Sequence, residues 1–389
     1  MPTPFSDELS LALRTVYAAS RLTKDVLRSL NNNVSGIAKA DDSPVTIADF
    51  AAQALIIGAV QAVYPDDAFV GEESSKQLRE NDALAERVWQ LVQRASTLEE
   101  ADASQMSDVQ HVQAYENSTT SQTSSGSLSF PRSKAEMLDL IDLGQTSQLR
   151  EGRVWVLDPV DGTATFMKGQ QYAVALCLVL DGEQQVGVIG CPNLHVDFDS
   201  EFVGMKIHED LVDEAEYGVV LSAVQGQGTY IRAMEPKGLG EPRPISHTQG
   251  YTSRDLSTLN FVESAVGATS LSQEEHRLVA ESLGATPWPG TTIWSQQMKY
   301  VSLVLGASDV HLRIPKTKDR FTMVWDHAGG HLLFTEAGGT IKDFDGKPID
   351  FGQGRYLKGD TNYGMVCAAP WCFDTVMKAV KDVLDQRTR

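Results

Sequence analysis

An apolar run that ends in two acidic residues constrains the fold more than any other feature of this chain. Residues 154–157 read Val-Trp-Val-Leu, and Asp158 and Asp161 follow with Pro159 and Val160 between them. An unbroken apolar run of this length is typical of a strand buried inside a layered protein. Two carboxylates this close together repel each other unless a cation lies between them. The run therefore predicts a buried strand with an acidic site at its carboxyl end.

The six residues 158–163, Asp-Pro-Val-Asp-Gly-Thr, suit magnesium and phosphate chemistry. Mg²⁺ prefers hard oxygen ligands, and two carboxylates beside a backbone carbonyl provide them. Gly162 permits a tight turn into a short helix, and the amides of Gly162 and Thr163 at its start could hold a phosphate. An isolated Asp-x-x-Asp-Gly is more often a plain turn with capping aspartates, so the motif alone leaves both interpretations open.

Helices and strands alternate along the rest of the sequence. Apolar spacing of three to four residues predicts helices at 8–30, 44–60, 83–95, 135–143, 273–283, 295–305 and 325–337. Apolar runs predict strands at 68–71, 154–157, 172–180, 186–190, 217–223, 228–232, 259–263 and 310–313. This alternation indicates a layered α/β fold.

We expect two domains. Residues 234–244 are rich in Pro and Gly and are the best linker candidate. The expected domains are therefore an α+β domain at 1–236 and an α/β domain at 237–389. Residues 104–129 are rich in Ser, Thr and Gln with few aliphatic side chains, which is typical of a solvated segment with little order. We place this low-complexity insertion at about 76–135.

Charge and composition exclude several kinds of partner. The chain has 33 basic and 52 acidic residues and a net charge of −19, which disfavours a nucleic acid as partner. Bound cations could still reverse the local potential for a small anion. The longest apolar run, residues 172–180, is about half the length of a membrane span, and no secretory signal is recognisable. The four cysteines lack CxxC spacing, so we expect a cytoplasmic protein without a zinc site or a disulfide framework.

Three further acidic residues stand in settings similar to that of the 158–163 motif. Glu72 follows the predicted strand 68–71, and Asp49 lies in a predicted helix just after the sequence Asp-Ser-Pro-Val-Thr at 42–46. Asp326 follows Trp325 at the start of another predicted helix. Each alone has an ordinary explanation as a helix cap or a solvated acid.

Taken in order, these segments resemble the lithium-sensitive, Mg²⁺-dependent inositol monophosphatase superfamily, and within it the 3′(2′),5′-bisphosphate nucleotidases. The segments that carry the resemblance are 42–49, 71–74, 158–163 and 325–328, with supporting matches at 166–174, 190–194 and 309–313. They span nearly the whole chain except about 76–130. The resemblance implies a five-layer αβαβα sandwich with the site between the two domains.

The resemblance also implies roles for individual residues. Two to three Mg²⁺ ions would be bound by the carboxylates of Asp49, Glu72, Asp158, Asp161 and Asp326 and by the carbonyl of Val160. Thr163, hydrogen-bonded to Asp49, would orient and deprotonate the water that attacks a phosphomonoester, and Glu72 would take part in catalysis. Gly162 and Thr163 would contact the phosphate.

The segments expected to choose the leaving group differ from those of the nucleotidases. No histidine follows Glu263 until His276, and Ser295 and Gln296 stand where that branch has Asp and Ser. Lys299 and Arg313 do match that branch. We therefore predict a substrate site made of Lys299, Arg313, Ser295 and Gln296.

Three functions follow from this comparison, in order of preference. The first is hydrolysis of 3′-phosphoadenosine 5′-phosphate and related bisphosphates. The second is the same mechanism on an inositol phosphate, a sugar phosphate or a pathway-specific metabolite, and the third is a non-enzymatic regulator that binds a phosphorylated ligand. In each case we expect a monomer whose partner is a small phosphorylated metabolite, with no nucleic acid and no membrane.

Overall fold

A large mixed sheet positions the acidic motif. The computed structural model describes residues 4–29, 36–38, 44–110, 127–199, 205–214, 216–246, 255–267 and 269–387. The sheet has the order β10-β8-β7-β6-β5-β4-β3, with β9 paired to β8, and only the β3–β4 pair in it is parallel. Its strands are β3 (Ala68–Gly71), β4 (Arg153–Asp161), β5 (Ala173–Leu180), β6 (Glu183–Cys191), β7 (Val219–Val224), β8 (Thr229–Glu235), β9 (Gly238–Leu239) and β10 (Arg243–Ile245).

Helices cover both faces of this sheet. On β4, Trp155 and Leu157 pack in one core cluster with α1 (Ser6–Ser29) and α2 (Ile47–Gln61). Val154 and Val156 pack in a second cluster with α8 (Gln296–Val304) and α9 (Ala328–Glu336). Because successive side chains of a strand point to opposite faces, a strand covered on both sides is apolar throughout. The buried strand predicted at 154–157 is therefore confirmed.

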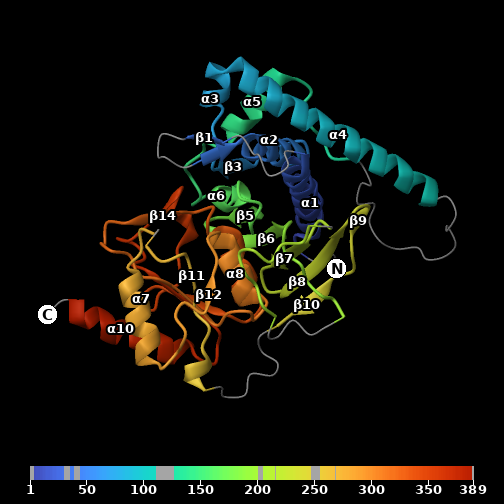
Figure 1. Ribbon diagram of the computed structural model, residues 1–389. Helices are drawn as coiled ribbons and strands as arrows, with labels where there is room; N and C mark the ends of the chain where they lie inside the picture. The colour runs from blue at the N-terminus through green and yellow to red at the C-terminus, as the bar shows by residue number, and fades with distance from the viewer. Residues whose placement is uncertain are drawn as a thin grey trace.

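A second sheet and two further helices complete the layers. It has the order β13-β17-β15, formed by β13 (Val310–Arg313), β17 (Met365–Ala368) and β15 (Thr340–Lys342). Val310 and Val366 pack against α7 (Gln273–Ser282) and α10 (Phe373–Arg387), whereas Cys367 packs with α8 and α9. Helix, sheet, helix, sheet and helix thus follow one another (Figure 1), as the αβαβα expectation requires.

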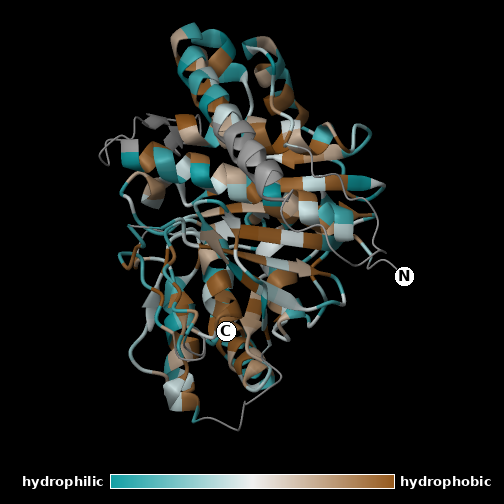
Figure 2. Cartoon of the chain, turned by 90° about the vertical axis from the view of Figure 1, so that its right-hand side faces the viewer, coloured by the Kyte–Doolittle hydropathy of each residue, from teal (hydrophilic) through white to brown (hydrophobic). Residues whose placement is uncertain are grey.

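Two-stranded sheets occupy the periphery. They pair β1 (Gly36–Ala38) with β2 (Pro44–Thr46), β11 (Val262–Glu263) with β12 (Thr291–Thr292), and β14 (Phe321–Met323) with β16 (Tyr356–Lys358). Figure 2 shows hydrophobic colour along the central strands, while the outer helices carry both colours. In the described part of the chain, no helix combines the length and the apolar character needed to cross a membrane.

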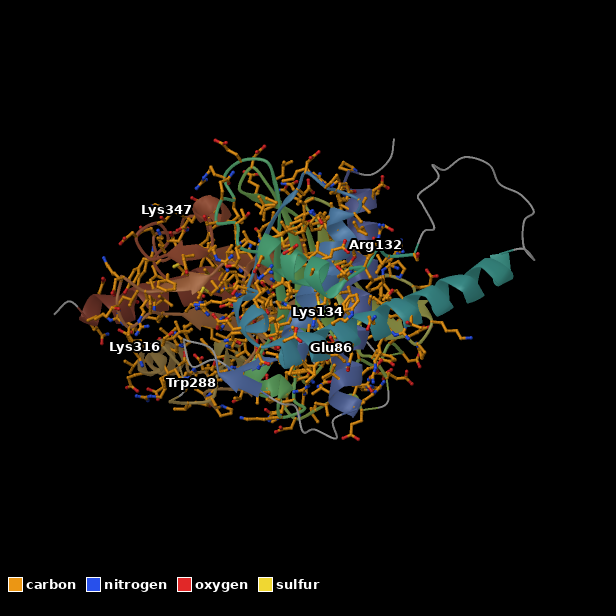
Figure 3. All side chains as sticks on the ribbon, turned by 90° about the horizontal axis from the view of Figure 1, so that it is seen from above. Glu86, Arg132, Lys134, Trp288, Lys316 and Lys347 are labelled. Atoms are coloured by element: carbon orange, nitrogen blue, oxygen red, sulfur yellow. The ribbon has the colours of Figure 1, made fainter. Side chains whose placement is uncertain are left out.

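The helical region after β3 is longer than expected. α4 (Asp82–Gln110) and α5 (Lys134–Leu143) lie beside α2, and α3 (Lys76–Glu80) lies beside α4. In Figure 3, α4 extends beyond the body of the protein. Lys134 Nζ donates to Asp82 Oδ1 at 2.6 Å and to Glu86 Oε2 at 3.4 Å, which joins α5 to α4 (Figure 3).

Two details correct the predicted insertion. Residues 104–110 are helical, because residues 82–110 contain no Gly or Pro and many good helix formers. Leu128 is buried in the first core cluster, so the end of the segment belongs to the core. Residues 111–126 of the predicted insertion lie outside the described residues.

The predicted linker at 234–244 is wrong. Met234 pairs with Leu239 and Pro244 with Tyr230, so the segment extends the large sheet through β9 and β10. Proline is tolerated there because β10 is an edge strand whose free side needs no donor. The domain division at 236 and 237 stays a prediction.

Candidate active site

The end of β3 lies beside Leu157 of the parallel strand β4 at the acidic site. β3 pairs with β4 so that Gly71 lies opposite Leu157, and Glu72 and Asp158 are the next residues of each strand. β4 does not end at Asp158 as expected, because it continues to Asp161 with a break in register between the two aspartates. Residues three apart point to opposite faces of a regular strand, and such an irregularity can bring both to one side.

Asp158, Asp161 and Asp326 form the centre of the site. One carboxylate oxygen from each lies within 4.8 Å of the others, and Asp326 is two residues before α9. Burial raises the pKa of all three carboxyls. The charge of Glu72 adds to this effect at Asp158, and that of Asp161 does so at Asp326, whose pKa rises to about 8.

This cluster fits a bound cation. Asp158 Oδ1 is buried, and within the described residues it has no hydrogen-bond partner. An unpaired buried carboxylate oxygen among like charges is costly, and a hard divalent cation would offset both the desolvation and the repulsion. Glu72 and Asp49 are not in the set that meets the 4.8 Å distance, but their charges also raise the pKa of Asp158.

The N-terminus of α8 holds the carboxylate of Asp161. The amides of Gln297 and Gln296 donate to it at 2.6 and 3.3 Å, and the Ser295 hydroxyl donates to Oδ2. Ser295 also caps the helix, because its Oγ accepts from Met298 N at 3.1 Å. These donors lower the pKa of Asp161 and partly offset its burial. Ser295, predicted to contact substrate, thus holds a predicted metal ligand in place.

Thr163 lies beside Asp49 and the end of β4. It is the first residue of α6 (Thr163–Phe166), and its hydroxyl lies 3.3 Å from Asp49 Oδ1 and 3.2 Å from Val160 O. Asp49 is fully buried in the first turn of α2. A hydroxyl has one hydrogen, so it donates to one of these oxygens at a time and can accept from a third group.

Gly162 is required by its surroundings. Its φ is +92°, and a Cβ at this position would lie 2.9 Å from Ser295 Cβ. Only glycine adopts this conformation without strain and leaves room for α8 to approach. The turn therefore brings Asp161, Thr163 and Ser295 together.

A cavity of about 300 Å³ adjoins the acidic cluster. It is lined by Asp161, Gly162, Ser264, Thr269, Ser270, Leu271, Trp294, Ser295, Gln296, Lys299, Arg313 and Asp326. All four predicted substrate residues are in this set. The cavity therefore lies between two carboxylates of the cluster, Asp161 and Asp326, and two cationic side chains.

The two cations have different surroundings. Lys299 is buried, and its Nζ donates to Ser264 Oγ at 2.9 Å and to Trp294 O at 3.2 Å. Burial lowers the pKa of Lys299 to about 8. Arg313 is half-buried and donates to Gln296 Oε1 at 2.7 Å and to Thr322 Oγ1 at 2.9 Å. Positive charge held beside a cavity binds anions, even in a protein whose net charge is negative.

Sequence reasoning missed two glutamines that support the site. Gln53 lies one turn after Asp49 on α2, and its amide accepts from Glu73 N at 3.0 Å and donates to Glu73 O at 2.7 Å. A glutamine in an otherwise apolar helix, four residues after an aspartate, is a signal that could have found it. Gln297 donates to Trp325 O at 2.7 Å and accepts from Gly330 N at 2.9 Å, and no local pattern marks this contact.

Known proteins match this sequence over nearly its whole length. Residues 7–373 match the inositol monophosphatase family. The chain is 39% identical over 381 residues to an Emericella nidulans protein named 3′(2′),5′-bisphosphate nucleotidase, covering 98% of this chain and 99% of that protein. It is 36% identical over 382 residues to a Schizosaccharomyces pombe protein of the same name, covering 97% and 96%.

Solved structures share the fold at low sequence identity. An inositol monophosphatase from Anabaena has a TM-score of 0.55 and 16% identity, covering 98% of this chain and 97% of that one. One from Thermotoga maritima has a TM-score of 0.54 and 16% identity, covering 98% and 99%. With a family match over most of its length and relatives aligned from end to end, the chain belongs to the inositol monophosphatase family.

Proposed function

We propose that this chain is a metal-dependent phosphomonoesterase that hydrolyses 3′-phosphoadenosine 5′-phosphate and related 3′(2′),5′-bisphosphates. The observation that carries the proposal is the cavity in which Asp161 and Asp326, two members of the carboxylate cluster with Asp158, face the same space as Lys299 and Arg313. A bisphosphate presents two anionic groups, one for the cleaved ester and one for recognition. The names of the relatives from Emericella nidulans and Schizosaccharomyces pombe support the same substrate class.

We propose that the metal is Mg²⁺ and that two to three ions bind in the site. Its ligands would be Asp158, Asp161 and Asp326, with Glu72, Asp49 and the carbonyl of Val160 completing the set. Bound Mg²⁺ supplies Lewis-acid stabilisation of the phosphate oxygens and lowers the pKa of water. We also propose inhibition by lithium, which the family resemblance supports.

The chain's own residues orient the reaction. Asp49 holds the Thr163 hydroxyl, whose oxygen is then free to accept a hydrogen bond from the attacking water. The amides of Gly162 and Thr163 hold the phosphate that reacts, and Glu72 completes the catalytic set. Lys299 and Arg313 bind the second phosphate, and Ser295 and Gln296 shape that part of the cavity.

A second candidate is the same reaction on an inositol phosphate or a sugar phosphate. It is favoured by Gln296, whose amide is engaged by Arg313 and lies 3.1 Å from His311 Nε2. This differs from the serine that the nucleotidase branch has at that position. A ligand-binding regulator without activity has less support, because the Asp49–Thr163 contact suits catalysis.

Location and assembly are part of the proposal. The four free cysteines are all buried, which supports a reducing, cytoplasmic setting. The net charge of −19 supports a protein that binds no nucleic acid, and we propose a monomer.

Phosphate release from a panel of substrates tests the proposal. With Mg²⁺ present, we expect kcat/KM for 3′-phosphoadenosine 5′-phosphate to exceed that for inositol 1-phosphate by about 100-fold, since a lost hydrogen bond to a charged group costs about 1.5–3 kcal/mol. A preference for the inositol phosphate would favour the second candidate, and no release from any substrate would favour the regulator.

A further inference from the structure

Arg355 is bonded to the end of β3, where Glu72 begins. It lies just before β16, and its Nη2 donates to Gly71 O at 2.8 Å. Its Nη1 donates to Gly144 O at 2.8 Å and to Thr146 O at 3.3 Å. Gly144 O also accepts from Gly71 N at 2.8 Å, so the guanidinium closes a network around the residue before Glu72.

The same side chain covers the residue before Asp326. The guanidinium carbon lies 4.7 Å from the centre of the Trp325 ring. The carbonyl of Arg355 accepts from Val324 N at 2.9 Å, which ties its backbone to the same segment. Glu72 and Asp326 come from distant parts of the chain, and Arg355 contacts the neighbour of each.

A guanidinium suits this position better than other cations. It is planar, so it donates hydrogen bonds in its plane while its face stacks on an indole ring. Burial lowers the pKa of Arg355, and the negative charge of Glu72 opposes that shift. The three carbonyls that accept from Arg355 and the Trp325 ring therefore fix the position of the guanidinium. The guanidinium in turn limits the movement of the segments that carry them.

We propose that Arg355 is a positioning residue that holds Glu72 and Asp326 at the separation needed to bind metal. The inference rests on the proposed metal-dependent function. Arg355 acts through Gly71 and Trp325 and is not among the residues that line the cavity. Residues bonded directly to metal ligands typically change metal affinity by about 10- to 100-fold when they are replaced, and Arg355, which acts through neighbouring residues, belongs at the lower end of this range.

Three variants of the full chain test the inference. Arg355→Met keeps an unbranched apolar side chain and removes the donors, and Arg355→Lys keeps the charge without the planar group. Arg150→Met is the matched control. Arg150 Nη2 donates to Asp350 Oδ2 at 2.7 Å, so it also joins two segments that are distant in the sequence, but among the described residues it bonds neither Gly71 nor Trp325. Mg²⁺ binding is measured by calorimetry, and hydrogen exchange is measured on the metal-free proteins.

We expect Arg355→Met to bind Mg²⁺ about tenfold more weakly than the wild type. Amides in residues 70–73 and 144–147 should exchange faster, while those of α10 should be unchanged. Arg355→Lys should restore only part of the affinity, because an ammonium cannot reproduce the stacked, planar contact. Arg150→Met should bind Mg²⁺ as the wild type does.

Several results would overturn the inference. They are wild-type Mg²⁺ affinity in Arg355→Met, full rescue by Arg355→Lys, or faster exchange throughout the protein, which would indicate a general loss of stability. Failure of the proposed function is separate. A wild type that binds Mg²⁺ but releases no phosphate from a bisphosphate would reject the function and leave the positioning role intact.

Discussion

At the scale of single residues, Asp326 shows how burial and charge set the pH response of the site. Burial and the charges of Asp161 and Glu72 raise its pKa from 3.8 to about 8. A carboxyl with a raised pKa takes up a proton on folding, so the metal-free fold loses stability as pH rises from about 4 to about 8. We predict a lower melting temperature in chelator at pH 8 than at pH 5, with most of the difference removed by Mg²⁺. Equal melting temperatures in chelator would contradict this.

Asp161 tests the role of charge in the cluster. Asp161→Asn removes one anionic ligand but keeps an oxygen that can accept from Gln297 N, so the fold should persist. We predict weaker Mg²⁺ binding and a fall in kcat of about 100-fold or more, because charge stabilisation is usually the largest part of such catalysis. The measurement is kcat as a function of Mg²⁺ concentration. A kcat close to that of the wild type at saturating Mg²⁺ would show that Asp161 is not a metal ligand.

Thr163 separates catalysis from metal binding. Thr163→Ala removes the hydroxyl that contacts Asp49 at 3.3 Å and leaves the carboxylates in place. We expect kcat to fall by about 100-fold while Mg²⁺ affinity is unchanged. Thr163→Ser keeps the hydroxyl and should recover most of the rate. Loss of Mg²⁺ affinity in the alanine variant would instead assign Thr163 to the metal site.

At the scale of elements, the start of α8 is both a helix cap and a support for the site. Ser295→Ala removes the cap on Met298 N and the donor to Asp161. Ser133→Ala is a matched control, because Ser133 caps α5 by accepting from Glu136 N at 3.1 Å, on a helix that contributes none of the predicted site residues. Each should lose about 1 kcal/mol of unfolding free energy in a denaturant titration. Only Ser295→Ala should also lower kcat, and equal kcat values in the two variants would reject the second role.

Elements with a clear local pattern were predictable from the sequence. The strand at 68–71 and the helices α1, α2, α5 and α7 follow from apolar spacing, and the acidic motif at 158–163 marks the site. The short strands β14 and β16, of three residues each, were missed because so few residues show no period. The linker at 234–244 was misassigned because Pro and Gly also occur in edge strands and hairpins.

The candidate site was predictable to the extent that its residues carry their own chemistry. Acidic residues after strands have a local signature, and Asp158, Asp161 and Asp326 do come together. The contacts of Gln297 and Arg355 go to backbone carbonyls of distant segments. Such contacts depend on how the layers pack, and no spacing along the chain encodes them.

At the scale of the whole molecule, the cavity lies where the layers meet. The large sheet contributes Asp161 to the lining of the cavity, α8 contributes Lys299, and the second sheet contributes Arg313. A protein with a net charge of −19 repels anions at long range, so binding of a bisphosphate depends on charges that are local to this cavity. Recognition of a second phosphate by this cavity is therefore what distinguishes the proposed substrate from a simple phosphomonoester.

The most direct test compares two substrates that differ only in that phosphate. We would measure kcat/KM for 3′-phosphoadenosine 5′-phosphate and for adenosine 3′-phosphate, at saturating Mg²⁺, in the wild type and in Arg313→Met. We predict that the wild type prefers the bisphosphate by about 100-fold. Arg313→Met should lose most of this preference, because its kcat/KM falls for the bisphosphate but not for adenosine 3′-phosphate. Equal kcat/KM values for the two substrates in the wild type would contradict this prediction.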